Sequence, residues 1–106
     1  MQNLALVAYH EKRFADAEDR YGELATLKKG MLDEVGLAEA LEWQGICQEK
    51  QNAYARAVEA WEEAALVCKA FEMKDRLAPV LTHVRRAYEK LRMKDELLHF
   101  DEIWNS

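Results

Sequence analysis

The chain has 106 residues, of which half are apolar and a third charged, the balance of a single soluble globular domain. A formal net charge of −5 argues against nucleic-acid binding, which usually requires a basic surface. No apolar run approaches the ~20 residues of a membrane-spanning helix. We therefore expect a cytoplasmic protein without signal peptide or anchor, and no nucleic acid or membrane among its partners.

The composition predicts an all-α chain. It contains one Pro and four Gly, and it lacks the runs of Val, Ile and Thr from which strands are built. Six helices are predicted, over residues 1–12, 14–29, 36–50, 53–72, 76–92 and 94–105. Very short turns at residues 13, 51–52 and 93 make the helices of each pair antiparallel. Longer breaks at residues 30–35 and 73–75 are expected to separate one pair from the next.

The fourth predicted helix shows the clearest amphipathic pattern. Its apolar side chains recur every three or four residues, at Tyr54, Ala57, Val58, Trp61, Ala64, Ala65, Cys68 and Phe71. In the fifth helix, Asp75 is the expected N-cap. Pro79 should lie close to the start of that helix, because only the first turn tolerates proline.

Three similar stretches, which open at Phe14, Tyr54 and Lys94, follow one another at a spacing of 40 residues. A fixed period of this size is typical of stacked helical hairpins. Such stacks provide surfaces for partners far more often than catalytic pockets.

Small and aromatic side chains recur at the same spacing of 40 residues, both within these stretches and in the helix before each of them. Small residues permit close approach of antiparallel helices, and aromatic rings fill the space between hairpins. The small residues are Ala5, Ala17, Gly45 and Ala57, and the aromatic ones are Phe14, Tyr21, Tyr54 and Trp61. This arrangement resembles the tetratricopeptide repeat in its extended form. The third stretch departs from the pattern, because Arg85, Leu97 and Asp101 occupy the corresponding positions.

The resemblance implies an all-α, right-handed superhelix of three antiparallel helix pairs. It covers residues 1–106 as a single domain, with units of about residues 1–30, 36–72 and 76–105. It also implies a non-enzymatic module that binds a peptide or helix of a partner protein in a concave groove.

The groove is expected to be lined by the first helix of each pair. The middle unit would contribute Glu39, Glu42, Trp43, Ile46 and Glu49, the first unit Leu6, Tyr9 and His10, and the third unit Thr82, His83, Arg86 and Glu89. A different interpretation of Trp43 is that it packs onto an adjacent first helix and stiffens the stack.

The chemical motifs are weak. Glu96 and His99 form an E-x-x-H pair, but a di-metal site needs a second copy on a facing helix. No phosphate-binding loop, nucleophile elbow or dinucleotide turn is present. We expect no enzymatic activity, no cofactor and no metal.

Cys47 and Cys68 lie on apolar helix sides without a metal-binding spacing. They are predicted to be reduced core thiols, although a single bridge between neighbouring helices is an alternative.

Two other functions remain open. The groove of a sensor or regulatory domain would take a small molecule or a signalling peptide. A self-assembly module would form a homodimer through the apolar side of the last helix, at Leu97, Phe100 and Trp104.

Overall fold

The computed structural model describes the backbone of residues 2–104 and the side chains of residues 4–104. Within this range the chain forms helices and no strand, so the all-α prediction is confirmed. The helices are α1 (Gln2–His10), α2 (Phe14–Gly30), α3 (Glu34–Lys50), α4 (Tyr54–Ala70), α5 (Lys74–Leu91) and α6 (Lys94–Trp104). The largest helix contacts join elements that follow one another along the chain.

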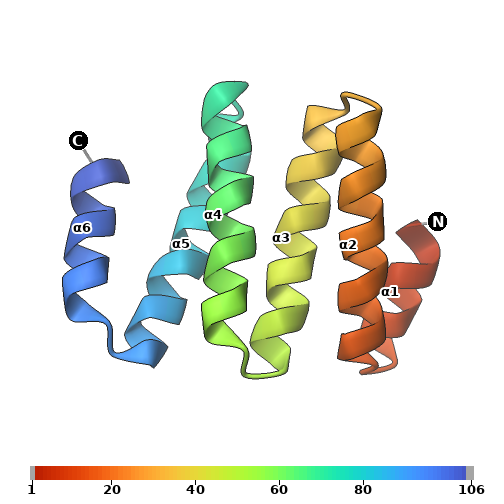
Figure 1. Ribbon diagram of the computed structural model, residues 1–106, viewed down its shortest axis with the longest axis horizontal. Coiled ribbons are helices and arrows are strands. Elements are labelled where there is room, and N and C mark those ends of the chain that lie inside the picture. The colour runs from red at the N-terminus through yellow and green to blue at the C-terminus, as the bar shows by residue number, and fades with distance from the viewer. Residues whose placement is uncertain (1, 105–106) are drawn as a thin grey trace.

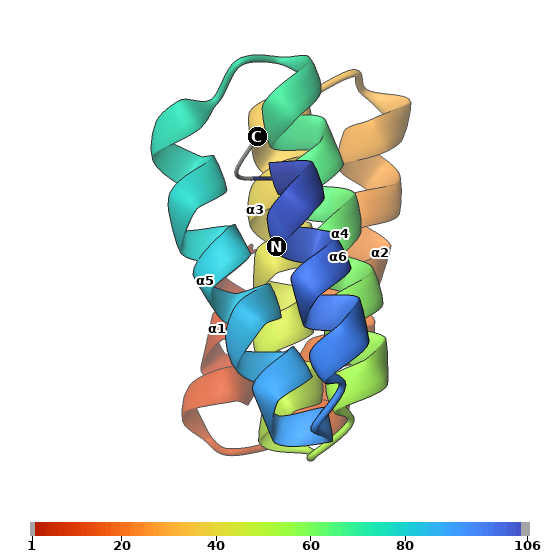
Figure 2. The same ribbon diagram turned by 90° about the vertical axis from the view of Figure 1, so that its left-hand side faces the viewer.

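The helices form two layers. In Figure 1, α2, α4 and α6 lie in front of α1, α3 and α5, and Figure 2 shows the same two rows from the side. The first and the last helix lie at opposite ends of the long axis of the molecule, which measures 37 Å. This consecutive packing is compatible with a helical repeat.

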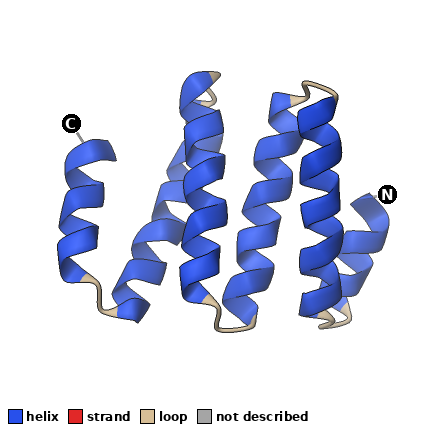
Figure 3. Cartoon of the chain, viewed as in Figure 1, coloured by secondary structure: helices blue, strands red, loops and turns tan. Residues whose placement is uncertain are grey.

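The five connections between the described helices are short loops (Figure 3). They share one backbone geometry. Each contains one residue with left-handed backbone geometry, and these residues are 20 positions apart, with φ between 56° and 63°: Lys12, Leu32, Asn52, Glu72 and Arg92. The next residue then donates its N–H to a carbonyl five positions earlier, as Ala53 does to Gln48 at 2.9 Å. This is the Schellman closure, which satisfies carbonyls at the end of a helix.

The longer breaks predicted at residues 30–35 and 73–75 are therefore wrong, because the connections between pairs are as short as those within pairs. Gly30 remains helical, and α3 begins two residues earlier than expected. The cause is Asp33, whose side chain accepts a hydrogen bond from the Gly36 N–H at 2.9 Å and so caps α3.

The start of α5 also differs from the prediction. Met73 occupies the N-cap position, so Asp75 lies in the first turn and Pro79 in the second. The Met73 carbonyl accepts the Leu77 N–H at 3.0 Å, which extends the helix upstream of the expected start. Pro79 has no N–H, so the Asp75 carbonyl lacks its usual helical donor.

The core centres on Trp61, which is fully buried. Its indole lies against Gly45, where an added Cβ would stand 2.3 Å from the indole Nε1. The indole N–H donates to the Glu42 carbonyl at 3.1 Å. Ala5, Ala17 and Ala57 are buried as well, as expected of small residues at close helix contacts.

The third hairpin closes differently from the first two. Arg85 occupies the position of Gly45, and Asp101 occupies that of Trp61. The two side chains form a bidentate ion pair, with the Arg85 Nη1 to Asp101 Oδ2 distance at 3.1 Å. An ion pair thus replaces the contact of an aromatic ring with a small residue.

Both cysteines are buried and free. Burial raises the pKa of the Cys47 thiol from 9.0 to about 11, and the neighbouring Glu18 adds to this effect. Burial also raises the pKa of Cys68. These side chains behave as small apolar core residues.

Candidate functional site

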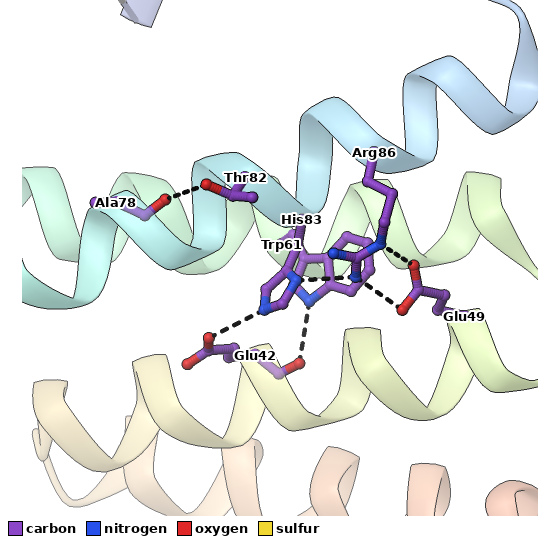
Figure 4. Close-up of polar contacts among 7 residues, drawn as sticks. All are labelled: Glu42, Glu49, Trp61, Ala78, Thr82, His83 and Arg86. Atoms are coloured by element: carbon purple, nitrogen blue, oxygen red, sulfur yellow. Dashed lines mark hydrogen bonds and ion pairs between the residues drawn. The ribbon is translucent and has the colours of Figure 1, made fainter.

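The predicted groove residues of α3 and α5 contact one another (Figure 4). Arg86 donates from Nε and Nη2 to the two carboxylate oxygens of Glu49, at 2.8 and 2.9 Å. His83 Nε2 lies 3.4 Å from a carboxylate oxygen of Glu42. Helices that begin 40 residues apart are therefore linked side by side through charged groups.

His83 is held on both sides. Its ring stacks on Trp61, with centroids 4.9 Å apart and planes 21° from parallel. Arg86 Nη2 lies 3.0 Å from His83 Nδ1. Because a guanidinium group only donates, Nδ1 must accept, and the ring proton then sits on Nε2 toward Glu42. The contacts thus define one tautomer.

Arg86 joins this cluster to the core. Its guanidinium carbon lies 5.9 Å from the centre of the Trp61 ring, a distance at which cation–π attraction operates. The bidentate hydrogen bond that Arg86 donates to Glu49 raises the pKa of Arg86 above its usual value. Hydrogen bonds and ring contacts within the chain thus hold the Arg86 side chain in place.

A further ion pair joins the same two helices. One carboxylate oxygen of Glu39 on α3 lies 3.5 Å from Arg76 Nη2 on α5. Arg76 is not among the predicted groove residues. A signal for it existed: Glu39 and Arg76 are 37 residues apart, as are Glu49 and Arg86. This spacing is about one helical turn shorter than the 40-residue period. It brings together side chains of two successive first helices.

Trp43 lies on the other side of α3. Its ring stacks on Tyr21 of α2 at 5.7 Å and meets the edge of Tyr9 of α1 at 5.2 Å. Trp43, Tyr9 and Ile46 are half-buried and pack against the core. Trp43 therefore bridges three helices, and only part of its side chain is exposed.

The remaining predicted groove residues are exposed. Leu6 and His10 stand on α1, and Thr82 and Glu89 stand on α5. The Thr82 hydroxyl donates to the Ala78 carbonyl of its own helix at 3.1 Å (Figure 4). The predicted groove residues on α3 are thus half-buried, as are Tyr9, His83 and Arg86, and the other four are exposed.

The residues predicted for self-association point inward. Phe100 is buried, and Leu97 and Trp104 are half-buried against the core. The apolar side chains that α6 exposes are instead Leu98 and Ile103, at 62% and 48% of their surface.

Residues 4–104 contain no group of three or more His, Cys, Asp or Glu side chains arranged to hold a metal ion. In the described chain, no helix combines the length and the apolar character needed to cross a membrane. Comparison with models of known protein families and with curated proteins found no match.

Proposed function

We propose that this chain is a tetratricopeptide-like module, a right-handed superhelix of three antiparallel helix pairs, that binds a peptide or helix of another protein. Binding takes place along the face of α1, α3 and α5, and the chain catalyses no reaction. Two free, buried cysteines accord with a reducing cytoplasmic setting.

One observation carries this proposal: side chains of each first helix contact side chains of the next first helix. Tyr9 of α1 contacts Trp43 of α3, and Glu49 of α3 binds Arg86 of α5. Because these contacts already hold the side chains in place, less side-chain entropy is lost when a partner binds.

Aromatic anchors in a preformed surface commonly contribute most of the affinity. Trp43 is such an anchor, since Tyr21 and Tyr9 hold its ring. Leu6 of α1 and Thr82 of α5 are exposed, and at the 40-residue spacing they are equivalent to Ile46 and Glu42 of α3. A segment laid across the three helices would contact all of them.

The test begins with selection of peptides from a random displayed library on the intact chain. The selected peptides are then measured against Leu6→Asp with Thr82→Arg, two exposed positions on this face. A matched control changes Leu66→Asp and Ala55→Arg on the exposed surface of α4, with the same change in charge.

We expect the face variant to weaken binding at least ~10-fold and the control to change it less than about twofold, as when contacts at an interface are removed. Loss of binding in the control alone would assign recognition to the layer of α2, α4 and α6. Failure to enrich any binding peptide would argue against the proposed function.

A further inference from the structure

A hollow of about 330 Å³ opens where α6 meets α4 and α5. It shares no lining residue with the predicted groove. Its lining consists of Glu62, Tyr88, Asp95, Glu96, His99, Phe100, Ile103 and Trp104.

The wall of this hollow is aromatic. Tyr88 and Phe100 have ring centroids 5.9 Å apart, and Phe100 and Trp104 have theirs 6.2 Å apart. Aromatic faces carry partial negative charge and attract cations in addition to apolar groups. A side chain with an apolar stem and a positive end is suited to such a wall.

The charged side chains are acidic. Three carboxylates line the hollow, those of Glu62, Asp95 and Glu96, and no Lys or Arg is among its lining residues. The Tyr88 hydroxyl donates to Glu62 Oε1 at 2.6 Å, which fixes that carboxylate and leaves its second oxygen able to accept. Burial, and then the hydrogen bond to Glu62, raises the pKa of Tyr88, and the charge of Glu96 adds to this effect.

A cation of the chain itself lies beside this wall. Lys69 Nζ is 5.3 Å from the centre of the Trp104 ring. The Trp104 ring of the aromatic wall thus already attracts one ammonium group of the chain. Lys69 is not among the residues that line the hollow, so its contact indicates the affinity of the Trp104 ring for a cation.

We propose that the hollow between α4, α5 and α6 binds a lysine or arginine side chain from a basic segment of a partner protein. The alkyl stem packs on Tyr88 and Phe100, and the positive end pairs with Glu62 and Glu96. This site goes beyond the proposed peptide-binding face, and either one can fail without the other.

The test uses the intact chain, labelled with ¹⁵N, and two capped peptides, one of alternating glycine and lysine and one of alternating glycine and glutamate. The readout is the indole N–H signal of Trp104, assigned through Trp104→Phe. We expect a saturable shift with the lysine peptide and none with the glutamate peptide.

The variant pair Glu62→Gln and Glu96→Gln removes two charges and keeps an oxygen that can accept from Tyr88, so the fold is preserved. We expect it to weaken binding of the lysine peptide at least ~10-fold, because the loss of one charge-assisted contact alone corresponds to about tenfold. The control pair Asp19→Asn and Glu63→Gln removes the same charge from exposed positions outside the lining and should change affinity less than about twofold.

Two results would overturn the proposal. A Trp104 signal that does not move with the lysine peptide would place any binding elsewhere. Equal weakening in both variant pairs would mean that the peptide responds only to the net charge of the chain.

Discussion

Replacing Gly45 by alanine tests the central contact of the fold. An added Cβ would stand 2.3 Å from Nε1 and 2.6 Å from Cδ1 and Cε2 of Trp61. Trp61 cannot yield easily, because it is fully buried, its indole donates to Glu42, and its ring stacks on His83. The two helices of the middle hairpin must therefore separate.

The magnitude follows from three opposing terms. Overpacking in a core costs about 2 kcal/mol, and loss of the Trp61 hydrogen bond costs about 1 kcal/mol more. Alanine regains about 1 kcal/mol through its better helix propensity. We expect Gly45→Ala to lower the free energy of unfolding by about 2 kcal/mol, which corresponds to a Tm about 10 °C lower.

Urea unfolding followed by far-ultraviolet circular dichroism measures this difference. The control is Gly30→Ala, because a Cβ there would have nothing within 4 Å. That variant should be as stable as the natural chain or slightly more so. If Gly45→Ala were as stable as Gly30→Ala, the Trp61 ring would not pack against Gly45. The proposed close contact of the two helices would then be wrong.

Three further predictions follow from the turns and the core. Ala57→Leu should lower the free energy of unfolding by roughly 1–3 kcal/mol in the same urea assay, since Ala57 is fully buried and its contact has no spare room. Leu32→Gly should raise it by up to ~1 kcal/mol, because Leu32 has φ at 58°, and Asn52→Gly should gain less because asparagine tolerates this geometry. The pKa of Cys47, about 11, lies above its ordinary value of 9.0, so a thiol reagent should label it very slowly at pH 8 without denaturant. The same raised pKa means that its contribution to stability is complete below pH 9 and is lost as the pH rises toward 11, a loss that urea melts of Cys47→Ala should lack.

The sequence predicted the helices well because apolar periodicity reflects burial directly. The pattern that begins at Tyr54 sets one face of α4 against the core, and the observed helix ends at Ala70, two residues before the predicted end. The turn residues carried no such signal. Lys12, Leu32 and Glu72 adopt left-handed geometry, although this conformation is usually marked by glycine.

The contacts across the candidate site were harder to predict. The 40-residue period placed Trp43 and His83 at equivalent positions but did not show that Trp43 stacks on Tyr21 while His83 stacks on Trp61. Which ring lies between two hairpins depends on volumes contributed by three helices. One helix pattern does not contain that information.

The two surfaces should differ in their response to salt. Near Trp61, the charged groups of α3 and α5 already bind each other, with Arg86 held by both oxygens of Glu49. A partner on that face meets charges that are largely neutralised, so its affinity should depend on apolar contacts and change little between low and moderate salt. The carboxylates of Glu62 and Glu96 line the hollow without a lysine or arginine among the other lining residues. Binding of a basic peptide there should weaken steadily as salt is raised. Affinities of the library-selected peptides and of the lysine peptide, measured over one salt series, compare the two directly. Equal salt dependence would show that the ion pairs between α3 and α5 do not neutralise that face.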